Sequence, residues 1–207
     1  MVHNGIDKQW NVETSVARWR AKICVLCSPD DILTKLLPAY TEEISKPTKR
    51  IIGLDFYQVK NIKIDDNIIR LLLIVISTQS WFASSRPTYF QGASAAVFAF
   101  SKSKYSFVES TIGLFYEFRR HIPEPTVPIA FVGLHDEVEV VPQTEGLSLA
   151  QEFGVDSFEM AVDDLQTLDA VLKSLLQKVM KKISTFFWSL VKILIIKLRL
   201  ALLTESG

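Results

Sequence analysis

The chain alternates short apolar runs with longer segments of helical periodicity, and this alternation limits its possible folds more than any other feature. Apolar runs typical of strands buried on both faces lie at 22–26, 95–100, 129–133 and 157–160. Helical patterns lie at 32–40, 105–121, 144–153 and 165–182. Repeated strand–helix units predict a mostly parallel sheet that is covered by helices on both faces.

Two further strand-like runs, 54–64 and 68–76, are separated only by Asp65-Asp66-Asn67, which is the spacing of an antiparallel hairpin. The predicted fold class is therefore α/β, with a six-stranded, mostly parallel sheet and one antiparallel hairpin strand. Open sheets of this kind bind ligands beyond the carboxyl ends of their strands. The loops at that edge follow Cys27, Ile76, Phe100, Gly133 and Met160.

Composition argues against several classes of function. The 207 residues carry 23 basic and 23 acidic side chains, so a net charge of zero offers no global field to attract nucleic acid. Cys24 and Cys27 form a C-x-x-C, but positions three apart on a strand point to opposite faces and are poorly placed to share a metal ion. The three histidines show no ligand spacing, so no metal site is predicted. The polar N-terminus lacks an apolar secretion segment, which favours the cytoplasm.

Several segments, in the same order and at the same intervals, resemble motifs of the Ras superfamily of small GTPases. Ile52-Gly53-Leu54-Asp55-Phe56 resembles the Rab-type I-G-V-D-F, and Tyr89-Phe90-Gln91-Gly92-Ala93 resembles Y-Y-R-G-A. Residues 128–133 are similar to P-I-I-L-V-G, and residues 150–155 to A-x-x-x-G-V. The resemblance covers 21–182, and it implies the P-loop NTPase-like Ras fold.

The segment that aligns with the phosphate loop departs from the pattern of this family. The motif G-x-x-x-x-G-K-T aligns with residues 27–34, where Cys27 and Ile32 replace the glycines and Leu33 replaces the lysine. Converging backbone N–H groups and a lysine are what such a loop uses to bind phosphate. Asp30 and Asp31 add negative charge, and one repulsion at 4 Å costs roughly 1 kcal/mol in water. Only Thr34 keeps the residue of the family.

The other segments that align with nucleotide-binding motifs also lack most of the residues of the family. The magnesium-binding threonine aligns with Ile51, and D-x-x-G-Q aligns with residues 75–79, where only Gln79 matches. The guanine-reading N-K-x-D aligns with residues 134–137, in which Glu137 could still accept a hydrogen bond from a base edge. The S-A-K element aligns with residues 161–163, Ala-Val-Asp. Thr34, Gln79 and Glu137 are therefore the candidate residues of a degenerate nucleotide site.

These departures favour a pseudo-GTPase, a Ras-like scaffold with no catalytic residue and no expected cofactor. In an active small GTPase the nucleotide and Mg²⁺ order the switch loops. Apolar packing at Ile51 and Val75 would replace those contacts and give one fixed conformation. The alternative is a divergent GTPase that binds GTP or GDP with Mg²⁺ and hydrolyses GTP slowly. A third interpretation is a core subunit of a larger complex.

The last part of the chain predicts a cationic amphipathic helix. The predicted organisation is an N-terminal extension at 1–20 with Trp10 and Trp19 in a helix, a Ras-like domain at 21–182, and the tail at 183–207. Basic residues follow one face of the tail, and no acidic residue lies between Asp169 and Glu205. The candidate contact residues of the tail are Phe186, Phe187, Trp188, Lys192, Lys197 and Arg199.

Three environments fit the tail: a membrane interface, an apolar groove of a partner protein, or a membrane span in which Lys192 would be costly. Prenylation is excluded because no cysteine follows Cys27. We therefore expect a protein of the cytosolic face of a membrane that binds protein partners, with an undetermined oligomeric state. Tyr57, Trp81 and Phe82 are candidate partner contacts, and core packing is expected for at least one of them.

Overall fold

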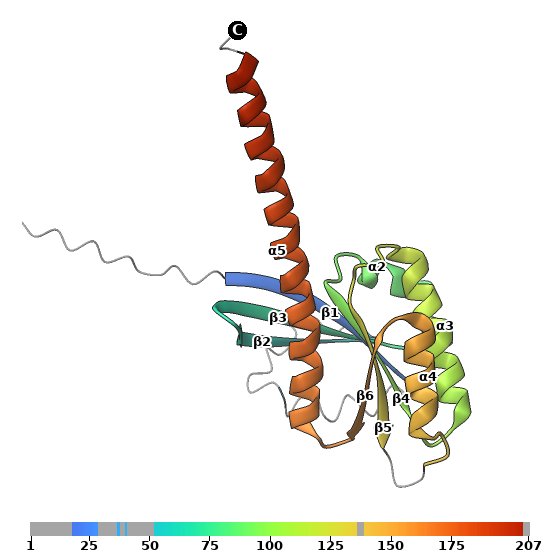
Figure 1. Ribbon diagram of the computed structural model, residues 1–207. Coiled ribbons are helices and arrows are strands. Elements are labelled where there is room, and N and C mark those ends of the chain that lie inside the picture. The colour runs from blue at the N-terminus through green and yellow to red at the C-terminus, as the bar shows by residue number, and fades with distance from the viewer. Residues whose placement is uncertain (1–17, 29–36, 38–39, 41–51, 136–138, 205–207) are drawn as a thin grey trace, which may run out of the picture.

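The computed structural model describes residues 18–28, 37, 40, 52–135 and 139–204 of the chain (Figure 1). One sheet of six strands has the order β2-β3-β1-β4-β5-β6. Its strands are β1 (Arg18–Ser28), β2 (Leu54–Ile64), β3 (Asn67–Ile76), β4 (Ala95–Ser101), β5 (Ile129–His135) and β6 (Asp156–Ala161). All neighbours pair in parallel except β2 and β3, which form an antiparallel hairpin. The predicted fold class is confirmed.

Helices cover both faces of the sheet. The helical elements are η1 (Ser80–Phe82), α2 (Arg86–Phe90), α3 (Tyr105–His121), α4 (Gln143–Phe153) and α5 (Leu165–Thr204). Figure 1 shows α5 on one face and α2, α3 and α4 on the other. Of the helix predicted over 32–40, only Leu37 and Tyr40 are described. Both are helical, and Leu37 is buried with the residues beneath α5.

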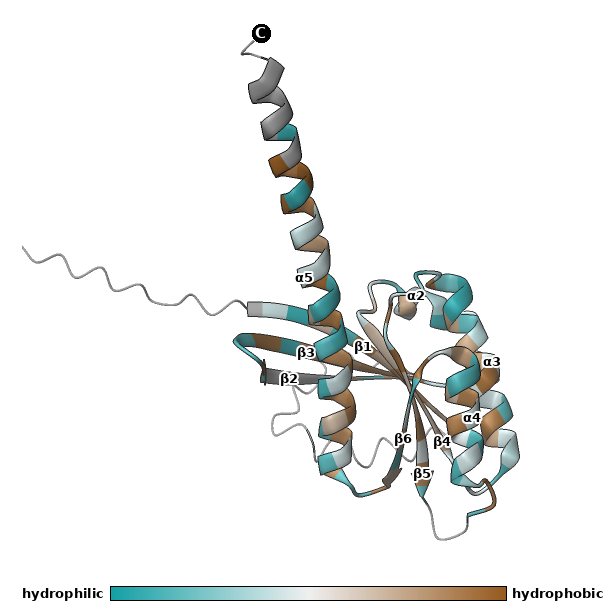
Figure 2. Cartoon of the chain, in the orientation of Figure 1, coloured by the Kyte–Doolittle hydropathy of each residue, from teal (hydrophilic) through white to brown (hydrophobic). Residues whose placement is uncertain are grey.

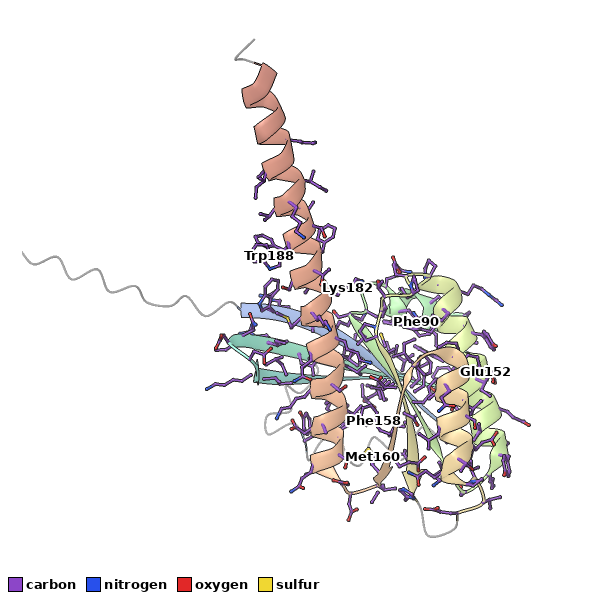
Figure 3. All side chains as sticks on the ribbon, viewed as in Figure 1. Phe90, Glu152, Phe158, Met160, Lys182 and Trp188 are labelled. Carbon is purple, nitrogen blue, oxygen red and sulfur yellow. The ribbon has the colours of Figure 1, made fainter. Side chains whose placement is uncertain are left out.

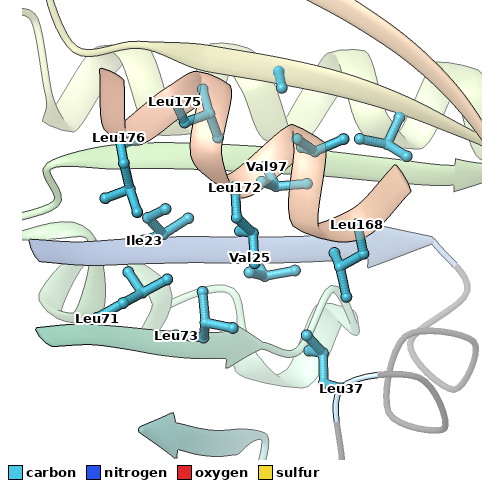
Figure 4. Packing of buried hydrophobic residues seen from close by; sticks show 14 of the residues in the cluster. Ile23, Val25, Leu37, Leu71, Leu73, Val97, Leu168, Leu172, Leu175 and Leu176 are labelled. Atoms are coloured by element: carbon cyan, nitrogen blue, oxygen red, sulfur yellow. The ribbon is translucent and has the colours of Figure 1, made fainter. Parts of the chain in front are cut away.

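The two faces bury two separate cores. The core beneath α5 is aliphatic, and Ile23, Val25 and Leu73 meet Leu172 and Leu176 there (Figure 4). The core beneath α3 is aromatic, with the rings of Phe90, Phe98, Phe118 and Phe131 in edge-to-face contact.

The two cysteines lie in different cores. Cys27 belongs to the aliphatic core and Cys24 to the aromatic core, so the prediction that they point to opposite faces of a strand is confirmed. Burial raises the pKa of the Cys24 thiol to about 11, which keeps this side chain in its protonated form.

Two elements run further than the sequence analysis predicted. β1 begins at Arg18, so the assignment of Trp19 to an N-terminal helix is wrong, and its Nε1 donates to Asn67 Oδ1 at 2.9 Å. Trp10 lies outside the described residues. α5 continues without a break through 182 and 183, where the sequence analysis placed a domain boundary. Its second half extends beyond the sheet (Figure 1).

Candidate functional site

The carboxyl ends of the parallel strands meet along one edge of the sheet, as the predicted topology requires. These ends are Ser28 of β1, Ile76 of β3, Ser101 of β4, His135 of β5 and Ala161 of β6. Of the three candidate nucleotide-site residues, Gln79 is described and is exposed just beyond β3. Thr34 and Glu137 lie outside the described residues. The edge has two halves, one around β1 and β3 and one around β4, β5 and β6.

Protein groups hold the segment that follows β3, residues 77–79. The backbone N–H of Ser77 donates to the carbonyl of Gly53 at 2.9 Å, which joins this segment to the start of β2. The hydroxyl of Thr78 donates to the carbonyl of Cys27 at 3.2 Å, at the end of β1. Val75, which aligns with the aspartate of the family motif, is buried in the aliphatic core. The segment is therefore bonded to both neighbouring chain segments.

A buried arginine adds a third attachment to this segment. Arg86 Nη1 donates to the carbonyls of Ser77 at 3.3 Å and Gln79 at 3.0 Å. Its Nε and Nη2 donate to the carboxylate of Glu117 on α3 at 2.9 to 3.1 Å. Bidentate, charge-assisted hydrogen bonds of this kind fix the relative orientation of the two side chains, and they are stronger than hydrogen bonds between neutral groups. We call these contacts the Arg86 clamp, because they tie α2, α3 and residues 77–79 together.

A polar cavity of about 440 Å³ lies beside the Arg86 clamp. Hydroxyl groups contribute much of its lining, together with Arg86 and Glu117 of the clamp. The remaining lining residues are Ser28, Thr78, Gln79, Ser80, Ala83, Ser110, Gly113 and Leu114. The cavity is thus lined by the end of β1, the segment after β3 and α3.

In the other half of the edge, four side chains form a charged cluster: Lys102, His135, Glu139 and Glu159. Lys102 is fully buried directly after β4, and its Nζ lies 2.9 Å from Glu159 Oε2 and 3.3 Å from Glu139 Oε2. His135 contacts Glu139 through Nδ1 and approaches Glu159 through Nε2 at 3.3 Å. The cluster joins the ends of β4, β5 and β6.

The charged cluster shifts two pKa values. Burial alone would lower the pKa of Lys102, but hydrogen bonds and charge from Glu159 and Glu139 outweigh it and raise this pKa above its ordinary value. Hydrogen bonding from His135, with help from Lys102, lowers the pKa of Glu139. The stability that Glu139 contributes is therefore present above the ordinary carboxyl pKa and is lost as the pH falls through the lowered value.

Gly133 makes room for the charged cluster. A Cβ at this position would lie 2.6 Å from Glu159 Oε1, so the carboxylate packs directly on the glycine. Leu134 and His135, which align with the guanine-reading motif, have other roles: Leu134 is buried in the aliphatic core, and His135 faces two carboxylates. Among the residues that the structure describes, no three His, Cys, Asp or Glu side chains are grouped to hold a metal ion.

Sequence reasoning missed Arg86, Glu117, Lys102 and Glu159. A signal was available for two of them. Lys102 lies two residues after the apolar run 95–100, and Glu159 lies between Phe158 and Met160, so each charge occurs close to apolar residues in the sequence. Arg86 carries no such signal because it lies in a polar stretch, Ser-Ser-Arg-Pro.

Two exposed apolar side chains form a surface near the start of β2. Ile52 is 81% exposed and Trp81 is 58% exposed, and Trp81 lies against Gly53, next to Ile52. We call them the Ile52–Trp81 patch. Tyr57 and Phe82, the other candidate partner contacts, are buried, so the prediction is wrong for these two. Core packing was expected for at least one of the three aromatic side chains, and it is found for Tyr57 and Phe82.

Substituting alanine at Gly53 is expected to lower the free energy of unfolding by about 2–4 kcal/mol. Gly53 has φ +88°, where an L-residue is strained by about 1–2 kcal/mol. A Cβ would also lie 2.8 Å from Phe82 and 2.9 Å from Trp81. Gly92→Ala is the matched control, because Gly92 has φ +73° but no atom near the position of a Cβ. The free energy of unfolding of both variants would be measured with urea. Equal losses in the two variants would show that contact of the new Cβ with Phe82 and Trp81 does not contribute.

The part of α5 beyond the sheet carries many hydrophobic residues (Figure 2), and most of those between 186 and 195 are exposed. Phe186, Phe187 and Trp188 are exposed, as are Lys192 and Lys197. Arg199 lies in α5, but its side chain is outside the described part of the structure. Within the described parts of the chain, no helix combines the length and the apolar content that crossing a membrane requires.

Comparison with known proteins gives two matches. The family model of the Ras family matches residues 33–181 of the chain. The Ras-related protein RabQ of Dictyostelium discoideum is 26% identical over 165 residues, a region that covers 77% of this chain and 80% of that protein. The family match begins at residue 33, near the end of the segment aligned with the phosphate loop.

Proposed function

The chain belongs to the Ras family, and on that basis we propose that it is a non-catalytic member which acts as an adaptor at the cytosolic face of a membrane. In this proposal it neither requires nor hydrolyses GTP. Protein contacts hold the conformation that a nucleotide would otherwise hold. Trafficking or the assembly of a complex is the setting that its similarity to Rab-type sequence suggests.

The Arg86 clamp is the observation that carries this proposal. In active small GTPases, the segment after the third strand is ordered by γ-phosphate and Mg²⁺ and is released on hydrolysis. Here Arg86 binds two carbonyls of that segment and one carboxylate of α3, and Thr78 binds the end of β1. Each of these contacts joins two groups of the chain itself. A segment held in this way supports one fixed conformation.

The residues aligned with the phosphate loop support the same conclusion. Cys27 stands at the first glycine, and its carbonyl accepts the hydrogen bond from Thr78. Leu33 stands at the lysine that would neutralise phosphate, and Asp30 and Asp31 add charge of the wrong sign. Few groups in this segment would favour a triphosphate.

Two surfaces support the adaptor part of the proposal. The Ile52–Trp81 patch exposes a tryptophan and an aliphatic side chain beside a segment held by the Arg86 clamp. Aromatic anchors on rigid segments are typical of protein–protein contacts. The apolar, cationic part of α5 has the composition of a helix that binds anionic lipid.

Thermal unfolding with nucleotide tests the proposal. A ligand at 1,000 times its Kd stabilises a protein by about 4.1 kcal/mol. For a chain of this size, that raises Tm by roughly 8–16 °C. We expect 1 mM GDP or GTP with Mg²⁺ to leave Tm unchanged, and we expect denatured protein to release no guanine nucleotide on chromatography.

The divergent-GTPase alternative predicts different results in the same experiment. Stabilisation by GDP that disappears when EDTA removes Mg²⁺, or guanine nucleotide released in a molar ratio near one, would overturn the loss of nucleotide binding. Adenine nucleotides with Mg²⁺ serve as the control for nonspecific effects of phosphate and metal.

A further inference from the structure

The apolar face that α5 packs on the sheet continues, on the same side of the helix, beyond the sheet. Eighteen residues make five turns of an α-helix, so residues 18 apart lie at the same angle around its axis. Leu168, Leu172, Leu175 and Leu176 are buried in the aliphatic core. The residues five turns further on, Phe186, Leu190, Ile193 and Leu194, are 66%, 50%, 51% and 59% exposed. Met180 and Ile183 mark the transition, since both are partly buried against the core.

The apolar side of the exposed part of α5 is wider than the side that carries its polar residues. Trp188 and Ile193 are about 140° apart around the axis at 100° per residue, and both are exposed. Trp188 lies beyond the sheet on α5 (Figure 3). Ser189 and Lys192 lie in the arc between these two residues, and most of the exposed apolar side chains lie in the remaining arc of about 220°. This arc is wider than the half of the helix that a flat apolar surface covers.

A flat lipid surface along the whole length of α5 is also blocked by the domain. The side that carries Leu190 and Leu194 is the side on which Leu172 and Leu176 contact the sheet. Helices bend sharply mainly at proline, glycine or inserted groups, and α5 contains neither proline nor glycine. A straight α5 with lipid against this side along its full length would place the sheet inside the lipid.

Cations gather where the helix leaves the domain. Lys178, Lys181 and Lys182 line a groove of about 660 Å³, together with apolar Ile183 and Phe186. Lys178 also pairs with Asp156, whereas Lys181 and Lys182 are exposed. No acidic residue occurs between Asp169 and Glu205. This arrangement suits the boundary between anionic headgroups and acyl chains, with positive charge at the headgroups and apolar side chains beyond.

We infer that α5 enters an anionic phospholipid leaflet at an inclination to its surface, with Lys181 and Lys182 among the headgroups and the sheet outside. The inference rests on the proposed membrane role. Residues 183–204 are about 33 Å long, and a leaflet core about 15 Å thick accommodates them at an inclination of roughly 30°. Lys192 lies within about 20° of Lys181 around the axis, so its ammonium group extends back toward the surface.

Depth measurements on two positions of the same helix face test this inference. Phe187 and Leu194 are seven residues apart, so they lie within about 20° of each other around the axis and about 10 Å apart along it. Full-length Phe187→Cys and Leu194→Cys variants would be labelled with bimane and mixed with phosphatidylserine-containing vesicles whose lipids carry nitroxide at shallow or deep positions. The buried native cysteines make labelled wild-type protein the control for background.

An inclined helix places the label at Leu194 deeper than the label at Phe187, by roughly 5 Å at 30°. Deep nitroxide then quenches the Leu194 label more strongly, and shallow nitroxide quenches the Phe187 label more strongly. Equal depths would overturn the inclination while leaving membrane binding intact. Failure of both variants and of wild-type protein to float with the vesicles would instead overturn the membrane role itself. In that case, an apolar groove of a partner protein is the remaining candidate environment for the exposed apolar side chains of α5.

Discussion

Replacement of Lys102 by methionine is expected to lower the free energy of unfolding by about 3–5 kcal/mol, the loss typical when a buried ion pair loses one partner. Lys102 is fully buried, and its Nζ lies 2.9 Å from Glu159 Oε2. Methionine keeps the length of the side chain but leaves the largely buried Glu159 carboxylate without its lysine. In a chain of this size, Tm should fall by roughly 6–20 °C in thermal unfolding at pH 7.

Lys178→Met is the matched control for Lys102→Met. Lys178 pairs with Asp156, but its side chain is half exposed, so its loss should cost less than about 1 kcal/mol. Adding Glu159→Gln to Lys102→Met should cost less than the sum of the two single changes, because the second change removes the uncompensated charge. Equal losses at Lys102 and Lys178, or additive losses at Lys102 and Glu159, would contradict the importance of this ion pair.

Replacement of Arg86 by glutamine is expected to release the segment that follows β3. The variant loses the guanidinium that binds the carbonyls of Ser77 and Gln79 and the carboxylate of Glu117. We expect a loss of about 2–4 kcal/mol in unfolding free energy. We also expect amide exchange in residues 77–82 to accelerate by about tenfold or more, since 1.4 kcal/mol corresponds to tenfold.

Arg119→Gln is the control for the Arg86 clamp. Arg119 also donates to two backbone carbonyls, those of Glu124 and Val127, but these belong to the segment that follows α3. Its loss should accelerate exchange near residues 122–127 and leave residues 77–82 unchanged. If Arg86→Gln leaves the exchange of residues 77–82 at the wild-type rate, the Arg86 clamp does not hold this segment and the main support for a fixed conformation is lost.

The two substitutions report on different halves of the same edge. The Arg86 clamp lies by the ends of β1 and β3, where the family binds phosphate and metal. The charged cluster lies by the ends of β4, β5 and β6, where the family binds the base. Both halves are held by ion pairs within the chain. Because the side chains of the chain itself hold both halves of this edge, we propose that the protein functions without nucleotide.

Much of the fold could be predicted from local pattern. The predicted helix at 105–121 has the bounds of α3, and the hairpin at 54–64 and 68–76 differs from β2 and β3 by one residue. Apolar periodicity is a property of neighbouring residues, so it can be read without knowing which elements meet. The continuity of α5 could have been predicted too, because no proline or glycine interrupts 165–204.

The site was less predictable. The residues expected to matter came from alignment with the nucleotide motifs, and two of them, Thr34 and Glu137, lie outside the described residues. The residues that hold the edge are Arg86 and Glu117, 31 positions apart, and Lys102 and Glu159, on different strand ends. No local pattern connects such pairs, since the two partners of each pair lie far apart in the sequence.

The sequence by itself determined the order of strands and helices, the opposite facing of Cys24 and Cys27, and the resemblance to the Ras family. Only the tertiary structure decided which charges pair and which apolar residues stay exposed. The reason is physical: hydrophobic patterning specifies which side of an element is buried, whereas an ion pair depends on the distance between two elements after they pack. Leu172 and Leu190 occupy the same side of α5, and only the end of the sheet makes one of them core and the other surface.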